Sequence, residues 1–180
     1  VIYALQRANL RMGEAVVVQG AGGLGLYAVA AAKEMGAGLV ISIDGLKSRL
    51  DLARQCGADH IIDINELREP EERIAKVKEL TGNREGADTV VEVVGYPQVV
   101  PEGLDMVRKG GTYVEVGHIW PESNVTIDLS KIIWNMITII GTAHYDPYVL
   151  SVALDFLEKT KDKYPITKVV SHKFPLEQIN

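Results

Sequence analysis

One short segment, Val16-Val17-Val18-Gln19-Gly20-Ala21-Gly22-Gly23-Leu24-Gly25, carries the strongest structural signal in the chain. It leads into an alanine-rich stretch, 26–35, and then into a second apolar run, 39–44, that ends in Asp44. The pattern predicts a buried strand, a glycine turn, a helix and a second buried strand. Gly20 and Gly22 lack Cβ atoms and would let a diphosphate approach the backbone, while Gly25 would let the helix pack close to the strand.

Asp44 lies beyond the glycine turn at roughly the 20-residue spacing at which a carboxylate can bind a ribose diol. A 2′-phosphate placed there would meet a like charge, so NAD is predicted in preference to NADP. Lys47 and Arg49 could offset part of that repulsion, or could belong to a solvated helix face. The nearest alternative, an S-adenosylmethionine fold, also combines a glycine loop with an acid at the end of the second strand, but the spacing of three glycines favours a dinucleotide.

Composition excludes several classes of function. With 180 residues and 47% hydrophobic content, the chain can bury one sizeable core and is expected to form one domain. A net charge of −5 gives no electrostatic case for nucleic acid or an anionic membrane surface. No apolar run approaches the ~20 residues that span a bilayer, and no signal-peptide pattern is present. The single cysteine, Cys56, excludes an internal disulfide, is expected to pack near a helix end, and fits a reducing cytoplasm.

Strand and helix signals alternate along the rest of the chain. Helices are expected over 46–55, from Pro70 to Leu80, from Val100 to Val107 with a stop at Gly110-Gly111, and over 146–159; strands are expected at 61–62, 89–94, 112–116 and 137–140; and 118–129 is a looser stretch. Parallel strands need helical crossovers. The prediction is therefore an α/β, three-layer Rossmann fold with a doubly wound, six-stranded parallel sheet in the order 3-2-1-4-5-6.

Both ends of the sequence look cut from something larger, because it begins inside a helix pattern and stops as another begins. We expect a single domain over 1–180 of a longer chain, with an opening helix over 1–12. Residues 168–180 would then start the return to an absent domain. In the predicted sheet, Gly95, Gly117 and Gly141 also follow strand ends, so they are expected to border the same crevice as the glycine turn.

Taken together, several motifs resemble the cofactor domain of medium-chain, zinc-type alcohol dehydrogenases, the group that includes sorbitol and threonine dehydrogenases. They are the segment 16–25, Asp44 with Arg49-Leu50, Gly57-Ala58-Asp59, Val91-Glu92-Val93-Val94-Gly95, Gly110-Gly111-Thr112 and Val116-Gly117. The resemblance covers nearly the whole chain. It implies an oxidoreductase in which zinc polarises an alcohol or polyol and hydride passes to NAD.

Carried over residue by residue, the resemblance implies a set of cofactor contacts. Backbone around Ala21 would hold the diphosphate, Leu24 would lie behind the nicotinamide, and Asp44 with Arg49 would bind the adenosine ribose. Segment 93–95 would line the adenosine side, while Val116 and segment 141–144 would hold the carboxamide. The complete set is Gly20, Gly22, Gly23, Leu24, Gly25, Asp44, Arg49, Val93, Gly95, Val116, Gly117, His118 and Ala143.

The residues for zinc are missing from this sequence. It has one cysteine, and His60, His118, His144 and His172 are scattered without ligand-like spacing. Each histidine is expected to be a surface or loop residue, although His118 and His144 follow strand ends that face the crevice. Zinc and the proton relay are therefore expected on an absent catalytic domain, so this chain alone would bind NAD(H) without turnover.

Two rival functions remain open at this point. A zinc-free, quinone-reductase-like relative would use NADPH, against which Asp44 argues. A non-catalytic module that senses NAD would also lack catalytic groups, although the abrupt ends argue against it. The pair Tyr164 and Lys168 has the Tyr-x-x-x-Lys spacing of short-chain dehydrogenases, but Pro165 disfavours the helix which that chemistry needs.

Association through the sixth strand is also predicted. An apolar edge strand over 137–141 is the kind that is usually paired or covered. In the resembled family the sixth strands of two subunits pair, which implies a homodimer or homotetramer. Trp120, Ile132, Ile133 and Trp134 would serve that surface or belong to the core.

Overall fold

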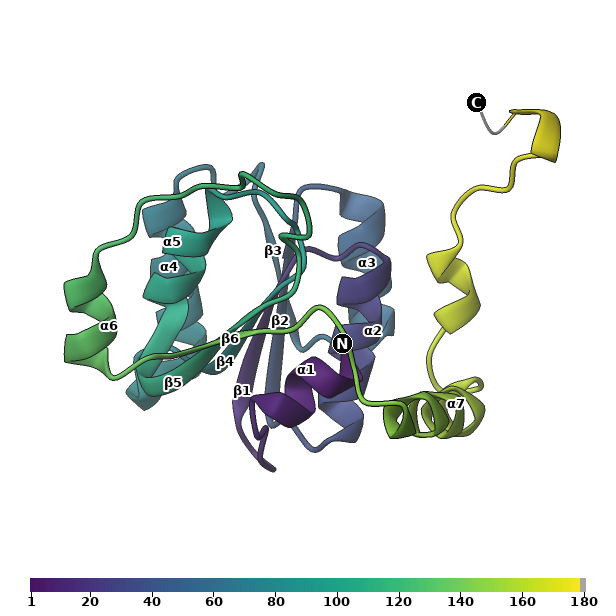
Figure 1. Cartoon of the computed structure of the whole chain (residues 1–180), viewed down its shortest axis with the longest axis horizontal. Helices are drawn as coiled ribbons and strands as arrows, with labels where there is room; N and C mark the ends of the chain where they lie inside the picture. The colour runs from purple at the N-terminus through teal and green to yellow at the C-terminus, as the bar shows by residue number, and fades with distance from the viewer. Residues whose placement is uncertain (179–180) are drawn as a thin grey trace.

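A computed structural model describes residues 1–178 as a parallel sheet between two layers of helices (Figure 1). Its regular elements are α1 (Ile2–Arg7), β1 (Ala15–Gln19), α2 (Gly23–Glu34), β2 (Leu39–Asp44), α3 (Lys47–Gln55), β3 (His60–Asp63), α4 (Pro70–Thr81), β4 (Ala87–Glu92), α5 (Val99–Met106), β5 (Val107–Glu115), α6 (Leu129–Asn135), β6 (Thr138–Gly141) and α7 (Tyr148–Thr160), with short 3-10 turns at Gly82–Arg84, Ile166–Val169 and Leu176–Gln178. Among the described residues, no helix is both long and apolar enough to cross a membrane.

The six strands lie in the order β3-β2-β1-β4-β5-β6, and every neighbouring pair is parallel. This confirms the predicted doubly wound, three-layer fold. The order reverses between β1 and β4, where the chain crosses from one half of the sheet to the other. A crevice for a ligand is expected beyond the carboxyl ends of the strands at this point.

Each face of the sheet has its own core. On one face, Val16, Val18 and Val40 pack with α1, α2 and α3; on the other, Val17 and Ile41 pack with α4 and α5. Every residue of β1 is buried, which fits a strand covered on both sides. Helix α2 buries a run of alanines, and their small side chains let it lie close to the sheet and to α1. Figure 1 shows α4, α5 and α6 on one side of the sheet and α2 and α3 on the other.

A buried carboxylate, Asp88, joins the strands at their amino ends. Its Oδ2 accepts hydrogen bonds from the Ala15 N–H at 2.7 Å and from Arg84 at 2.6 Å, and its Oδ1 accepts one from Arg108 at 2.6 Å. Burial alone would raise the pKa of Asp88, but these hydrogen bonds and the two arginine charges lower the pKa below its usual value. Asp88 therefore ties β1 to β4 and to the start of β5, at the edge opposite the predicted crevice.

The expected boundary between the fourth crossover helix and the fifth strand was wrong. Helix α5 ends at Met106 and β5 begins at once with Val107, running through the glycine pair that was predicted to stop the helix. The register with β4 shifts between Ala87 and Thr89, and a Cβ on Gly111 would lie 2.7 Å from Val107 and 2.9 Å from the carbonyl oxygen of Asp88. The glycines therefore serve a bulge inside the strand, where two backbones come too close for a side chain.

Helix α6 falls beyond the stretch predicted to be loose and was not expected. Asp128 caps it, since its side chain accepts hydrogen bonds from the N–H of Ser130 at 2.9 Å and from the Ser130 hydroxyl at 2.7 Å. Trp134 is 78% exposed and Ile133 is 75% exposed, as is Trp120 in the preceding loop at 76%, whereas Ile132 is half-buried against the core. Trp120, Ile133 and Trp134 are therefore not part of the core, whereas Ile132 is packed against it.

The C-terminal segment runs back along α2. Tyr164 is buried, and its hydroxyl donates a hydrogen bond to Glu34 at 2.7 Å. Lys168 belongs to the 3-10 turn Ile166–Val169, and its ammonium nitrogen lies 3.4 Å from the side-chain oxygen of Gln55. Tyr164 and Lys168 therefore do not form a catalytic pair on one face of a helix, in agreement with the prediction from Pro165. Beyond this turn the chain extends away from the body (Figure 1). Ile179 and Asn180, with which the expected return segment ends, lie outside the described residues.

Candidate functional site

The glycine turn joins β1 to α2 at the carboxyl edge of the sheet. Gly20 has a φ of +95°, and its N–H donates to the carbonyl of Ile43 at 2.8 Å. A Cβ on Gly25 would lie only 1.8 Å from the carbonyl oxygen of Gly20, so the helix rests directly on the turn. Gly22 differs, because a Cβ there would meet nothing within 4 Å. The turn is thus closed beneath and open at Gly22, where a ligand could approach the backbone.

Asp44, at the end of β2, is bonded to this turn. Its Oδ2 accepts a hydrogen bond from the Ala21 N–H at 2.7 Å, and its Oδ1 accepts one from the Leu46 N–H at 2.9 Å. The guanidinium of Arg49 lies 3.7 Å from the same carboxylate, with its side chain half exposed. The predicted acid therefore sits beside the predicted turn, with a cation at its outer side. Lys47, considered as a second cation, is an exposed residue of the first turn of α3.

Glu92, the last residue of β4, connects the two loops on the other side of the switch point. It is fully buried, and its Oε1 accepts hydrogen bonds from the N–H groups of Val94 and Gly95, the latter at 2.7 Å. Its Oε2 accepts one from the N–H of Gly117 at 3.1 Å. These bonds turn the chain out of the sheet after Glu92, which is why β4 ends two residues earlier than predicted.

The side chain of His118 lies between the carboxylates of Glu92 and Glu115. Its Nδ1 lies 2.8 Å from Glu115 Oε1 and 3.3 Å from Glu92 Oε2, and its Nε2 is buried without a hydrogen-bond partner among the described residues. Burial, together with the neighbouring Glu115, raises the pKa of Glu92 from 4.5 to about 7. The hydrogen bonds from the N–H groups of Gly95 and Val94 lower this pKa, but by less. Burial lowers the pKa of His118, but Glu115, Glu92 and the backbone of Tyr96 outweigh it and raise the pKa overall.

These shifts give the protein a stability that depends on pH. A carboxyl whose pKa is raised from 4.5 to about 7 on folding holds its proton more tightly in the folded state, so the stability it contributes is lost as pH rises through that window. The raised pKa of His118 acts in the same direction. We expect the free energy of unfolding to fall by roughly 1–3 kcal/mol more in the wild type than in Glu92→Gln between about pH 5 and pH 8. Urea unfolding across this range measures it, and parallel curves for the two proteins would contradict the assignment.

The other predicted site residues lie along the same edge. Val93 is half-buried, and its N–H donates to the Gln19 carbonyl at 3.1 Å, while Leu24 is 52% exposed at the start of α2. Val116 is half-buried after β5, and Ala143 and His144 are exposed after β6. The structure thus brings the whole predicted set to one edge. His118, unlike the other three histidines, is largely enclosed and turns Nδ1 toward carboxylates.

Glu92, Glu115 and His118 could suggest a metal site, because their ligand atoms lie within 4.8 Å of one another. Both oxygens of Glu92, however, already accept backbone hydrogen bonds, and Nδ1 of His118 faces Glu115 at hydrogen-bond distance. The group therefore forms a hydrogen-bonded network, and its geometry does not fit a tetrahedral zinc site. Sequence reasoning did not single out Glu92 or Glu115. The available signal was an acid inside an apolar strand, which must find partners when it is buried.

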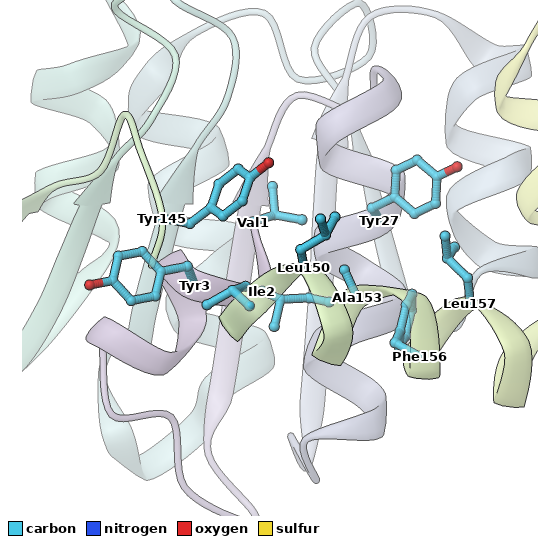
Figure 2. Close-up of a pocket in the computed structure, with 10 residues that line it drawn as sticks. Val1, Ile2, Tyr3, Tyr27, Tyr145, Leu150, Ala153, Phe156 and Leu157 are labelled. Carbon is cyan, nitrogen blue, oxygen red and sulfur yellow. The ribbon is translucent and has the colours of Figure 1, made fainter. Parts of the chain in front are cut away.

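An apolar cavity of about 370 Å³ lies between α1, α2 and α7 (Figure 2). Aliphatic and aromatic side chains line it, with Tyr3, Tyr27 and Tyr145 as the polar members, and Leu150 and Phe156 entering from α7. None of its lining side chains is a cation that could bind a diphosphate. The carboxyl edge of the sheet, by contrast, combines a backbone open at Gly22, a helix N-terminus and a carboxylate, and these features fit a dinucleotide.

Comparisons with known proteins agree with this geometry. A family model described as zinc-binding dehydrogenase matches residues 23–159. The chain is 37% identical to an erythritol/L-threitol dehydrogenase of Mycolicibacterium smegmatis over 177 residues, which cover 98% of this chain and 46% of that protein. It is 37% identical to an L-threonine 3-dehydrogenase of Bacillus subtilis over 169 residues, covering 92% of this chain and 46% of that protein.

A solved structure gives the same result. The crystal structure of an alcohol dehydrogenase from Thermotoga maritima superposes with a TM-score of 0.87 at 31% identity, covering 99% of this chain and 48% of that chain. This chain therefore spans about half the length of the relatives that it matches. Among the relatives named here, all are dehydrogenases and none is a quinone reductase.

Proposed function

The chain belongs to the zinc-binding dehydrogenase family, and from this membership we propose that it is the NAD(H)-binding domain of an alcohol or polyol dehydrogenase. The observation that carries the proposal is the hydrogen bond between Asp44 and the N–H of Ala21. It places a carboxylate next to the glycine turn, at the point where a dinucleotide presents its adenosine ribose after its diphosphate.

In this proposal each part of the crevice has one task. The backbone of 20–25 and the first N–H groups of α2 would hold the diphosphate, because those groups have no partner inside the helix. Asp44 would accept hydrogen bonds from the ribose hydroxyls, and Arg49 would lie beside it. The loop at 93–95 would line the adenosine side, and the loops at 116–118 and 141–143 would hold the nicotinamide end. NAD supplies hydride transfer when bound, and the chain's part is to orient the ring.

The substrate and the metal remain predictions about a longer protein. The M. smegmatis relative is named for erythritol and L-threitol, and others are sorbitol dehydrogenases, so we propose a small alcohol or polyol as the substrate. Zinc does not fit the residues described here and would be bound by another part of that protein. A cytoplasmic location is part of the same proposal.

Calorimetric titration of the chain with NADH, NADPH and S-adenosylmethionine tests the function. We expect NADH to bind more tightly than NADPH, because the 2′-phosphate meets Asp44, and S-adenosylmethionine not to bind. We also expect no oxidation of an alcohol by the chain alone, with or without added zinc. Tighter binding of NADPH would favour the quinone-reductase-like alternative, and binding of S-adenosylmethionine alone would overturn the proposal.

We further propose that two copies of the protein pair through β6. This strand forms an edge of the sheet, and its Ile139 is 45% exposed. The segment that leads into the strand exposes Ile133, Trp134 and Met136 as well. An open apolar edge of this kind favours pairing with another strand. We expect a dimer, or a higher oligomer, at micromolar concentration and a monomer for Ile139→Lys, as measured by light scattering. Leu154→Lys, which replaces an exposed leucine of α7, is the matched control and should leave the mass unchanged. A monomeric wild type would contradict the pairing.

A further inference from the structure

We propose that Glu92 is a positioning residue for the nicotinamide half of the cofactor, because it holds the loops after β4 and β5 in one fixed arrangement. The inference rests on the proposed NAD(H) site and adds to it a residue that would never touch the cofactor. The loops concerned are 93–95 and 116–118, which come from strands paired in parallel, with Glu92 opposite Glu115.

The first argument is the number of backbone donors that converge on one side chain. Oε1 of Glu92 accepts from Val94 and Gly95 in its own loop, whereas Oε2 accepts from Gly117 in the other loop. One carboxylate thus bonds both loops at once. A carboxylate has two acceptor oxygens and no donor, so it can serve donors on both sides. An amide of the same shape has only one acceptor oxygen, and it could serve only one of the two loops.

The second argument is that the two loops touch. A Cβ on Gly95, whose φ is +79°, would lie 2.6 Å from the carbonyl oxygen of Gly117. A Cβ on Gly117 would lie 2.5 Å from Glu92 Oε2 and 2.5 Å from the Gly95 N. Both positions therefore exclude any side chain. The loops and the carboxylate form one packed unit, so a change in the carboxylate moves the backbone of both.

The third argument is the charged surroundings of Glu92. Glu115 from β5 and His118 from the following loop approach it, the Tyr113 hydroxyl lies on the same face of the sheet, and the backbone of Tyr96 lies near His118. His118 Nδ1 stands between two carboxylates and offsets their repulsion when it carries a proton. Burying an acid is costly unless it is hydrogen-bonded, so a fully buried acid is a poor choice for packing alone. Here it supplies acceptors to loop backbone at the edge where the nicotinamide would lie.

The test compares NADH with ADP-ribose, which lacks the nicotinamide. We expect Glu92→Gln to weaken NADH binding about tenfold and ADP-ribose binding by less than about twofold. Loop 93–95 only lines the adenosine side, where Asp44 and the glycine turn remain in place, whereas loop 116–118 would hold the nicotinamide end. The fluorescence of bound NADH, which reports on the environment of the ring, should change in the same variant. Glu102→Gln, which breaks a buried ion pair with Arg73 away from these loops, is the matched control and should keep the ratio of the two affinities.

Two further measurements cover the case in which Glu92→Gln does not fold. Gly117→Ala should lower the affinity for NADH selectively, because its Cβ pushes the loops apart without changing a charge. In the wild type, the NADH affinity relative to ADP-ribose should fall from about pH 8 to about pH 6, as Glu92 takes up a proton and loses an acceptor site. If the wild type binds neither ligand, the proposed function fails. If it binds both, and neither the variants nor pH change the ratio, the positioning role is overturned.

Discussion

Gly25→Ala is expected to destabilise the protein by about 3 kcal/mol or more. The new Cβ would lie 1.8 Å from the carbonyl oxygen of Gly20 and 2.8 Å from its carbonyl carbon. Both atoms belong to the backbone, so no side-chain rotation relieves the clash, and α2 must move away from the turn. Because α2 buries much of one core against β1, this movement costs packing as well as strain.

Gly22→Ala is the matched control, in the same turn and with the same added methyl group. Its φ is −71°, which alanine adopts freely, and its Cβ would meet nothing within 4 Å. We expect its free energy of unfolding to stay within about 0.5 kcal/mol of the wild type. NADH binding should nevertheless weaken at least about tenfold, because the methyl group would occupy the space through which a diphosphate approaches the backbone.

Thermal unfolding and NADH calorimetry on both variants measure these effects. The expected pattern is a loss of stability in Gly25→Ala and a loss of binding without loss of stability in Gly22→Ala. Equal stability of all three proteins would contradict the close contact between the turn and α2. Unchanged NADH affinity in Gly22→Ala would place the diphosphate elsewhere.

The second large effect is expected at Asp44. Asp44→Asn keeps the size of the side chain but removes its charge and one of its two acceptor oxygens, which serve Ala21 and Leu46. We expect NADH binding to weaken roughly 10–100-fold, since hydrogen bonds to a charged group are the strong ones. NADPH binding should weaken less or improve, because the repulsion of its 2′-phosphate disappears while Arg49 remains.

Asp63→Asn is the control for this prediction. Asp63 is the register partner of Asp44 on β3, also at a strand end, and its Oδ1 accepts hydrogen bonds from the backbone and side chain of Asn65. It should leave the ratio of NADH to NADPH affinity unchanged. The measurement is the pair of dissociation constants for each protein. An unaltered ratio in Asp44→Asn would show that another group selects the cofactor.

The fold could be predicted from the sequence where local and tertiary signals agree. The segment from β1 to β2 combines apolar runs, a glycine turn and a terminal acid, and each feature demands the same arrangement. The glycine pair 110–111 was wrongly predicted to end a helix, because glycine is equally typical of a helix end and of a β-bulge. Only the pairing with the neighbouring strand decides between the two. Helix α6 was not predicted because it buries little surface, so its apolar residues do not repeat with the helical spacing that marks a face turned to the core.

The placement of the candidate site residues was predictable to a similar degree and for a related reason. Asp44 and the glycine turn were predicted to lie side by side, as they do in the structure, because that prediction depends on spacing along the chain. Glu92 was not, because its role depends on Gly117 and His118, which are brought to it only when β4 and β5 pair. A buried acid within an apolar strand signals that partners exist, but it does not say which residues they are.

Asp88 joins the strands at the edge farthest from the crevice, and this arrangement leaves the protein room to evolve. Substitutions that adapt the crevice to a new ligand often weaken a fold. Here the ion pairs of Asp88 with Arg84 and Arg108 lie at the opposite ends of the strands, so substitutions near the glycine turn leave these pairs in place. A lineage of this protein can therefore change its specificity at one end of the sheet and keep these stabilising contacts at the other.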